Sequence, residues 1–372
     1  MRYSLAFLTV MTALAQPPAQ RHLVSPEVHT DRTVTFRFRA PNAQKVEVAR
    51  EGLAQRVTLA KDDEGVWSGA SEPWEPDLYG YSFLVDGVAE MDPLNAKIKP
   101  NLLNPQSVVH VPGGPDLPWE IRNVARGAVH HHFYHSTVVG DDRDFYVYTP
   151  PNYDGHAKTP YPVFYLLHGY SDDASGWTAV GRAHVILDNL IAAGKAKPMV
   201  VVMPLGYGAL EMLAPNGPSF RDPELVRRNY ERFRDATLNE VMPAVEKAYN
   251  VSKDRAQRAI AGLSMGGAES LFTGLNRLDT FAWVGAFSAG GGAQDYDKTY
   301  PVLKTQAGEK LRLLWMGCGT EDRLIEPNRK FVDWLKSNGI RHTWVETSGG
   351  HTWMVWRRYL AEFAPLLFRA SS

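Results

Sequence analysis

Residues 258–267 read Arg-Ala-Ile-Ala-Gly-Leu-Ser-Met-Gly-Gly, and this stretch decides the fold. It begins as a short apolar run typical of a buried strand, and a helix-like segment follows it as far as Leu278. Between the two lies a G-x-S-x-G motif centred on Ser264, the pattern of a nucleophile elbow. In such an elbow the turn is too tight for side chains beside the serine, which is raised alone at the end of the sheet. The motif also arises by chance in glycine-containing loops, so the flanking strand and helix patterns are what favour a nucleophilic Ser264.

Two later segments supply candidate partners for this serine. Asp322 lies just beyond a predicted strand, and His351 lies after the last predicted strand and before the final helix. The chain order serine, acid, histidine is the order of the α/β-hydrolases. We therefore expect His351 to take the proton of Ser264 and Asp322 to orient the imidazole, with the neighbouring Glu321 as the alternative acid.

Backbone N–H groups are the expected donors to an oxyanion. The Met265 N–H would lie at the start of the helix that follows the serine, where the helix dipole also favours negative charge. The second donor should come from the loop after an earlier strand, and the Tyr170 N–H in Leu166-Leu-His-Gly-Tyr170 fits that place. One such donor contributes about 2.7–4 kcal/mol to stabilisation of the transition state. We interpret the nearby His168 as structural, because a triad needs only one imidazole.

The second part of the chain alternates strand-like apolar runs with helical patterns. This alternation predicts an α/β fold, a mostly parallel sheet with helices on both faces. The predicted strands are 143–148, 163–167, 199–203, 281–287, 311–316 and 342–345, and the predicted helices are 180–193, 233–249, 325–338 and 352–367.

Residues 22–111 give only β signals. Val34, Phe36 and Phe38 alternate with polar residues, a second alternating run covers 79–85, and Asp86-Gly87 is a strong hairpin turn. Short strands with frequent turns predict a β-sandwich. The segment resembles the immunoglobulin-like early-set domains that precede the catalytic domain in branching enzymes and some polysaccharide esterases. The resembling features are Ala40-Pro-Asn-Ala43, Lys45-Val-Glu-Val48, Gly65-Val-Trp67, Tyr79-Gly-Tyr-Ser-Phe83 and Asp92-Pro93.

Composition and the chain's N-terminal stretch complete the outline. A net charge of -1 gives no indication of a nucleic-acid or anionic-membrane partner, and the single cysteine, Cys318, excludes an internal disulfide. Residues 1–15 have the short basic start, apolar run and Ala-Leu-Ala end of a signal peptide, which predicts a secreted or periplasmic protein. We expect a linker at 112–120 and the α/β-hydrolase domain at 121–372. The histidines at 130, 131, 132 and 135 lack further ligands at zinc spacing, so we expect a polar loop or edge strand there and no metal site.

With these pieces in place, residues 136–368 resemble one branch of the α/β-hydrolases. That branch includes carbohydrate esterase family one (feruloyl and acetylxylan esterases), enterochelin esterases, S-formylglutathione hydrolase and mycolyltransferases. The resemblance implies ester hydrolysis through an acyl-enzyme on Ser264, with no metal or organic cofactor. It is carried by Val147-Tyr-Thr-Pro-Pro-Asn-Tyr153, Leu167-His-Gly169 with Asp172 and Trp177, Gly262-Leu-Ser-Met-Gly-Gly267, Gly319 with Asp322, and Gly350-His-Thr-Trp353 with Trp356.

The substrate is less strongly indicated than the chemistry. Trp177 and Trp353 are candidates for the wall of an aromatic acyl pocket, and both could equally be packing residues. The same choice applies to Trp67 and Trp74, which could stack on sugar rings but more often would form core. An export signal and a front β domain favour feruloyl or acetyl esters of plant cell-wall xylan. The alternatives are a siderophore esterase of the enterochelin type, acyl transfer in place of hydrolysis, and a non-catalytic glycan-binding protein.

Overall fold

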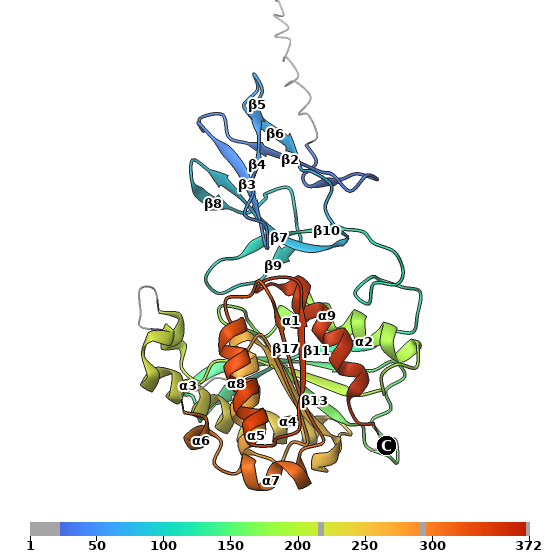
Figure 1. The fold of residues 1–372 in the computed structure, drawn as a ribbon. Helices are drawn as coiled ribbons and strands as arrows, with labels where there is room; N and C mark the ends of the chain where they lie inside the picture. The colour runs from blue at the N-terminus through green and yellow to red at the C-terminus, as the bar shows by residue number, and fades with distance from the viewer. Residues whose placement is uncertain (1–22, 215–218, 291–294, 370–372) are drawn as a thin grey trace, which may run out of the picture.

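The protein is described by a computed structural model that covers residues 23–214, 219–290 and 295–369. The predicted signal peptide, residues 1–15, lies outside the described residues. So do residues 215–218 and 291–294. Within the described ranges the chain forms a small β unit at one end of a larger α/β unit (Figure 1).

The small unit consists of two antiparallel sheets, as predicted for a sandwich. Alternate residues of β2 face inward, and Val34 and Phe36 are fully buried between the sheets. Trp67 and Trp74 are 7% and 5% exposed and belong to the same core, which agrees with the packing interpretation of both rings. One sheet has the order β1 (Glu27–Val28), β2 (Val34–Arg39), β6 (Val66–Ala70), β5 (Ala60–Lys61). The other has the order β4 (Val57–Thr58), β3 (Val46–Arg50), β7 (Asp77–Val85), β10 (Gln106–Val111), β9 (Ile98–Lys99), with β8 (Val88–Glu90) paired to β7.

The larger unit is built on an eight-stranded mixed sheet, which confirms the predicted α/β fold. Its order is β11 (Ala128–Ser136), β12 (Asp141–Thr149), β14 (Val200–Pro204), β13 (Val163–Leu167), β15 (Arg258–Leu263), β16 (Trp283–Phe287), β17 (Leu313–Gly319), β18 (Thr343–Thr347). The first three strands pair antiparallel, and the pairs from β14 to β18 are parallel. The carboxyl ends of the parallel strands therefore meet at one edge of the sheet.

Helices cover both faces of this sheet because the strand residues are apolar on both sides. Phe164 and Leu166 of β13 pack under one helical layer, whereas Val163 and Tyr165 pack under the other. The first layer contains α1 (Gly176–Ala179), α2 (Ala183–Ala192) and α9 (Trp353–Phe363). The second contains α3 (Pro223–Ala236), α4 (Met242–Ala248), α5 (Ser264–Asn276), α7 (Leu303–Lys310) and α8 (Ile325–Ser337), and α6 (Tyr296–Thr299) packs beside it. Short 3₁₀ turns lie at Leu210–Leu213, Ser219–Arg221, Arg255–Gln257 and Ala364–Leu366.

The helix predicted at 233–249 is too short at its N-terminal end, because the helical segment begins ten residues earlier, at Pro223. Asp222 caps it by accepting hydrogen bonds from the N–H groups of Glu224 and Leu225. Leu225, Tyr230 and Phe233 lie buried on one face of this helix, so the apolar pattern already extended over the turns that the prediction left out. A π-helical stretch, η3 (Thr237–Val241), joins α3 to α4, so the predicted single helix is interrupted.

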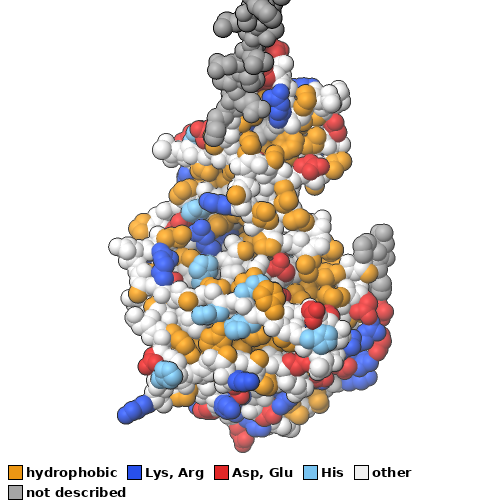
Figure 2. Space-filling view, turned by 180° about the vertical axis from the view of Figure 1, so that it is seen from behind, with side chains coloured by type: hydrophobic (Ala, Val, Ile, Leu, Met, Phe, Trp, Pro, Cys, Tyr) orange, Lys and Arg blue, Asp and Glu red, His pale blue; other side chains and the backbone are white. Residues whose placement is uncertain are grey.

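The four histidines of the 130–135 segment lie on β11, the outermost strand of the sheet, which agrees with the predicted edge strand. Figure 2, the view from behind, shows histidine side chains at the surface of the larger unit. His131 and His135 pair with Asp144 and Asp142 of the adjacent strand at 2.7 and 2.8 Å. Across the described ranges, no cluster of three or more His, Cys, Asp or Glu side chains has the arrangement of a metal site. Nor does any helix formed by these residues have the length and apolar character needed to cross a bilayer.

Candidate active site

Ser264 lies at the junction of β15 and α5, at the carboxyl edge of the sheet. Its φ of 51° is in the left-handed region, which a residue other than glycine adopts only when its surroundings enforce it. The surroundings are tight. A Cβ at Gly262 would lie 2.6 Å from the carbonyl of Gly266, and one at Gly266 would lie 2.2 Å from the carbonyl oxygen of His168. Both distances are too short for any side chain, so the strained turn requires these two glycines, as the motif predicted.

The structure brings Ser264 and its two predicted partners, His351 and Asp322, together. The Nε2 atom of His351 lies 2.9 Å from the Oγ of Ser264. Its Nδ1 lies 2.8 and 3.0 Å from the two carboxylate oxygens of Asp322. With Nδ1–H donated to the carboxylate, the free Nε2 faces the serine hydroxyl and can accept its proton. The ring is held edge-on to Trp356, with the centroids 4.9 Å apart.

Asp322, and not Glu321, faces the histidine. The Asp322 side chain is fully buried, and it accepts a further hydrogen bond from the Leu324 N–H at 2.8 Å. Burial alone would raise the pKa of the Asp322 carboxyl, but the hydrogen bond and charge of His351, with help from Leu324 and Ser288, lower it overall. The carboxylate is therefore ionised at neutral pH. Glu321 is turned away and accepts a hydrogen bond from the Gly349 N–H, where it fixes the loop that leads to His351.

The segments that contain the two predicted oxyanion donors adjoin Ser264. Met265 follows it in the first turn of α5, so its N–H has no partner within the helix. Tyr170 follows Gly169, and a Cβ on that glycine would lie 3.4 Å from the Cβ of Ser264. No described residue accepts a hydrogen bond from either N–H. Both N–H groups therefore belong to segments that border Ser264, and neither is taken up by a described residue.

A buried polar network supports the Tyr170 loop, and the sequence did not reveal it. His168 is 1% exposed, its Nδ1 bonds the Gly169 carbonyl at 2.8 Å, and its Nε2 accepts from the Gly206 N–H at 2.8 Å. This confirms the structural interpretation of His168, and burial lowers the pKa of its imidazole to about 4. Glu269 of α5 is fully buried beside it, and its carboxylate accepts from Asn229 at 3.0 Å. Burial raises the Glu269 pKa well above its usual value.

The tryptophans considered for the substrate pocket are core residues. Trp177 and Trp353 are 0% and 1% exposed, and their rings pack edge to face with centroids 5.0 Å apart. The Trp177 Nε1–H donates to the Leu167 carbonyl at 2.9 Å. Neither ring presents a surface to a substrate in this structure, so we assign both to packing behind the site in place of the substrate-binding role. A tryptophan in an apolar segment can serve either in the core or in a pocket wall, so the sequence alone did not decide between packing and substrate binding.

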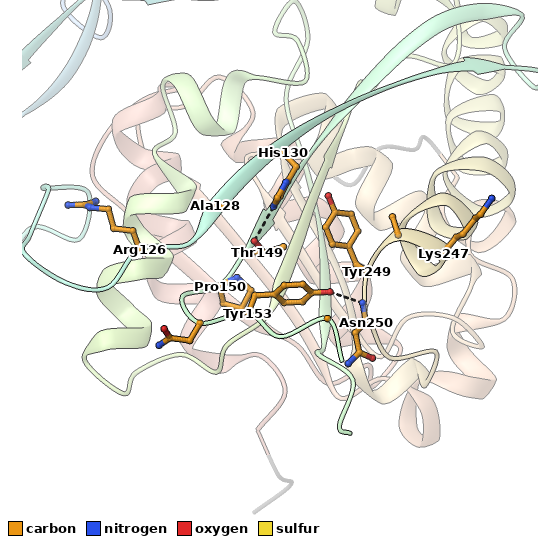
Figure 3. Close-up of a pocket in the computed structure, with 12 residues that line it drawn as sticks. Arg126, Ala128, His130, Thr149, Pro150, Tyr153, Lys247, Tyr249 and Asn250 are labelled. Atoms are coloured by element: carbon orange, nitrogen blue, oxygen red, sulfur yellow. Dashed lines mark hydrogen bonds between the residues drawn. The ribbon is translucent and has the colours of Figure 1, made fainter. Parts of the chain in front are cut away.

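A separate cavity has a volume of about 580 Å³. Figure 3 shows side chains that line it. It is lined by Arg126, Thr149, Tyr153, Lys247 and Tyr249 among others. Thr149 ends β12, which runs antiparallel to β14, so the cavity is at the opposite edge of the sheet from Ser264. Two of its polar groups are already paired, since the Tyr153 hydroxyl accepts from the Asn250 N–H and Thr149 bonds His130. It contains none of the predicted site residues.

The chain is similar to several known proteins. A family model described as "Putative esterase" matches residues 136–367. An endo-1,4-β-xylanase/feruloyl esterase of Xylanibacter ruminicola is 30% identical over 352 residues, which are 92% of this chain and 46% of that protein. The chain thus spans just under half of the length of that relative.

Two solved structures extend the comparison. A CE1 ferulic acid esterase from Anaeromyces mucronatus superposes with a TM-score of 0.59 at 24% identity, covering 68% of this chain and 96% of its own. The enterobactin esterase of Shigella flexneri gives a TM-score of 0.64 at 19% identity and covers 90% of this chain and 92% of its own. At these identities the likeness shows a shared fold, and in the second case it extends over both units.

Proposed function

The chain belongs to the esterase family whose model matches residues 136–367, and from this premise we propose that it is a serine esterase acting through an acyl-enzyme on Ser264. The observation that supports the mechanism most directly is the position of the His351 ring. It bridges the strained serine at 2.9 Å and the buried Asp322 carboxylate at 2.8 Å. A serine, an imidazole and an ionised carboxylate in that sequence form the standard device for acyl transfer.

The proposed reaction has two halves. In the first, the Ser264 Oγ attacks the ester carbonyl carbon while Nε2 of His351 takes the hydroxyl proton. The carbonyl oxygen becomes an oxyanion, to which the N–H groups of Met265 and Tyr170 donate. The C–O bond to the alcohol then breaks, and His351 returns the proton to the leaving oxygen. Asp322 keeps the imidazole in the required tautomer and stabilises its charged form.

In the second half a water molecule takes the place of the alcohol. His351 removes a proton from the water as the oxygen attacks the acyl carbon, a second oxyanion forms, and the bond to Ser264 Oγ breaks with return of the proton to the serine. The products are a free acid and the regenerated enzyme. An alcohol that reached the acyl-enzyme before water would give transfer in place of hydrolysis.

For the substrate we propose a feruloyl or acetyl ester of plant cell-wall xylan. The support is the relative from Xylanibacter, whose name joins a xylanase with a feruloyl esterase and which aligns with 92% of this chain. Export through the segment 1–15 is part of the same proposal, because polymeric xylan is found outside cells. The division into a signal peptide, a front domain at 22–111, a linker at 112–120 and an esterase domain at 121–372 is likewise proposed.

The test is release of acid from methyl ferulate and from acetylated xylan, with Ser264→Ala as the control. Ferulate release that is lost in the variant would support a feruloyl esterase, and release of acetate alone would indicate a small acyl pocket. Equal and measurable rates for the wild type and Ser264→Ala would refute the serine mechanism, and no release from any ester by either protein would favour a glycan-binding protein.

A second candidate substrate rests on a specific observation. The fold of an enterobactin esterase matches 90% of this chain, including the front β unit. A cyclic catechol siderophore should therefore be a third substrate in the same assay. Its cleavage at a higher kcat/KM than methyl ferulate would replace the xylan proposal, whereas no cleavage would leave the likeness as one of fold.

A further inference from the structure

We propose that the front β-sandwich is a positioning element of the esterase site: Asn101 and Glu51 hold, from one side, the loop of Tyr170 and the loop of His351. The inference rests on the proposed function of Ser264. It assigns to the sandwich a role in the turnover of every ester, including small ones that have no polymer to bind.

On the oxyanion side, a segment after β9 bonds the residues that directly follow Tyr170. The Nδ2 of Asn101 donates to the Oγ of Ser171 at 2.9 Å and to Oδ1 of Asp172 at 3.2 Å. The Leu102 N–H donates to the Ser171 carbonyl at 2.7 Å. Ser171 has a φ of 67°, so its backbone needs such restraint to stay in the left-handed region. The direction of the adjacent Tyr170 N–H depends on that backbone.

The orientation of the Asn101 amide is itself fixed. Its Oδ1 accepts hydrogen bonds from the N–H groups of Leu103 and Asn104 at 3.0 and 2.8 Å. The NH₂ group is therefore directed at the esterase unit. Because the Asn101 amide is bonded to the sandwich through its oxygen and to the Ser171 loop through its nitrogen, a shift of the sandwich would also shift the Ser171 backbone.

On the histidine side, the contact is a carboxylate at a helix N-terminus. Oε1 of Glu51 accepts from the Trp353 N–H at 3.2 Å. Trp353 is the first residue of α9 and lies two residues after His351. The carboxylate satisfies one of the unpaired N–H groups of the helix start and is favoured there by the helix dipole. Glu51 thereby fixes the point at which the chain leaves His351.

Lys99 links the two contacts into one cluster. Its Nζ pairs with Oε2 of Glu51 at 3.1 Å, and both side chains are only about a tenth exposed. Its charge also acts on Asp172, which is 5% exposed. Burial raises the pKa of Asp172 to about 7, and Lys99 and Asn101 act in the opposite direction. One lysine thus lies between a carboxylate bonded to the His351 loop and a carboxyl group of the Tyr170 loop.

The experiment measures kcat and KM of the full chain on methyl ferulate or another small soluble ester that the wild type hydrolyses. The variants are Asn101→Ala and Glu51→Gln, and Lys45→Ala is the matched control, since Lys45 is an exposed side chain of the same sandwich that pairs, among the described residues, only with Glu47 of that sandwich. A misplacement of about 1 Å in a catalytic group costs on the order of 10²-fold. We expect kcat to fall between about 10-fold and 100-fold in both variants with KM changed less than threefold, and no change in the control.

A rescue separates positioning from a general loss of structure. Asn101→Asp combined with Asp172→Asn exchanges the donor and the acceptor of one hydrogen bond, so the pair should recover most of the kcat that Asn101→Ala loses. The rate of Ser264 labelling by diisopropyl fluorophosphate should follow the same order. Variants labelled as fast as the wild type, with unchanged kcat on the small ester and loss only on xylan, would overturn the inference and make the sandwich a polymer-binding unit. A wild type that is neither labelled nor active on any ester would overturn the proposed function first, and the inference with it.

Discussion

Gly319 is the last residue of β17, three residues before Asp322, and we predict that Gly319→Ala will impair catalysis by displacing the histidine loop. A Cβ at this position would lie 1.9 Å from the carbonyl oxygen of Gly349. An ordinary contact needs about 3.4 Å, so one of the two backbones must move by roughly 1.5 Å. Gly349 is two residues from His351, and Glu321 already ties its N–H in place.

The expected loss follows from that displacement. A shift of about 1 Å in a catalytic group costs on the order of 10²-fold in rate, so kcat should fall by about 10²-fold or more. Because Asp322 Oδ2 and His351 Nδ1 are only 2.8 Å apart, a moved loop stretches this bond and the one to Ser264 together. Overpacking should also lower the free energy of unfolding by about 1–3 kcal/mol.

The assay is steady-state hydrolysis of a small ester, with thermal unfolding measured on the same preparation. Gly308→Ala is the matched control, because a Cβ there meets nothing within 4 Å and the residue lies in α7 away from the site. The control should keep full activity and gain about 0.5–1 kcal/mol of stability. A folded Gly319→Ala protein with the kcat of the wild type would refute the view that this close approach sets the position of His351.

Three further changes test other parts of the structure. Asp322→Asn should lower kcat by about 10⁴-fold through the wrong imidazole tautomer, whereas Glu321→Gln should retain most activity; the reverse result in the ester assay would transfer the acid role to Glu321. The pKa of the Asp172 carboxyl is raised to about 7 in the folded protein. Between about pH 4 and pH 7 this carboxyl therefore stays protonated in the folded protein but ionises in the unfolded chain. The free energy of unfolding consequently falls as the pH rises through that window. Asp172→Asn should therefore raise the unfolding midpoint more at pH 8 than at pH 4.5, and an equal shift at both would contradict this. Arg357→Met should cost about 3–5 kcal/mol in urea unfolding, because it removes the 2.6 Å partner of the buried Asp77 carboxylate and leaves only Arg358 at 3.5 Å; a cost below 1 kcal/mol would show that the pair contributes little.

The central part of the site could be predicted because its signals are local. Ser264 stands in a motif whose glycines are required by contacts within a few residues and one neighbouring strand. Asp322 and His351 each follow a strand of the same parallel sheet, and parallel strands bring their carboxyl ends to one edge. Topology alone therefore brings together three residues that are up to 87 positions apart in the sequence.

The features of the site that the sequence did not predict depend on packing between segments that are distant in the chain. Glu269 reads as an ordinary charged position on a helix, yet it is fully buried and bonded to Asn229 from another helix. Trp177 and Trp353 end apolar patterns that fit a pocket wall as well as a core. Their mutual packing and their burial in the structure decide that both rings belong to the core and not to a pocket wall. The early start of α3 is a different case, because Asp222 followed by Pro223 is a helix-start signal that the sequence does carry.

The relation between the two units was the least predictable feature, and it bears on function. A linker at 112–120 suggests independent parts, but the fully buried Arg357 of α9 donates to Asp77 of β7 at 2.6 Å and to the Leu78 carbonyl at 2.7 Å. The same guanidinium donates to the Val180 carbonyl of the esterase unit at 2.9 Å. A sandwich that swung away would leave this guanidinium without its carboxylate, and breaking a buried pair typically costs about 3–5 kcal/mol. The sandwich is therefore held in one position relative to α9, the helix whose first turn leaves His351. A unit fixed in this way can transmit its position to the esterase site, which a loosely tethered polymer-binding unit could not do.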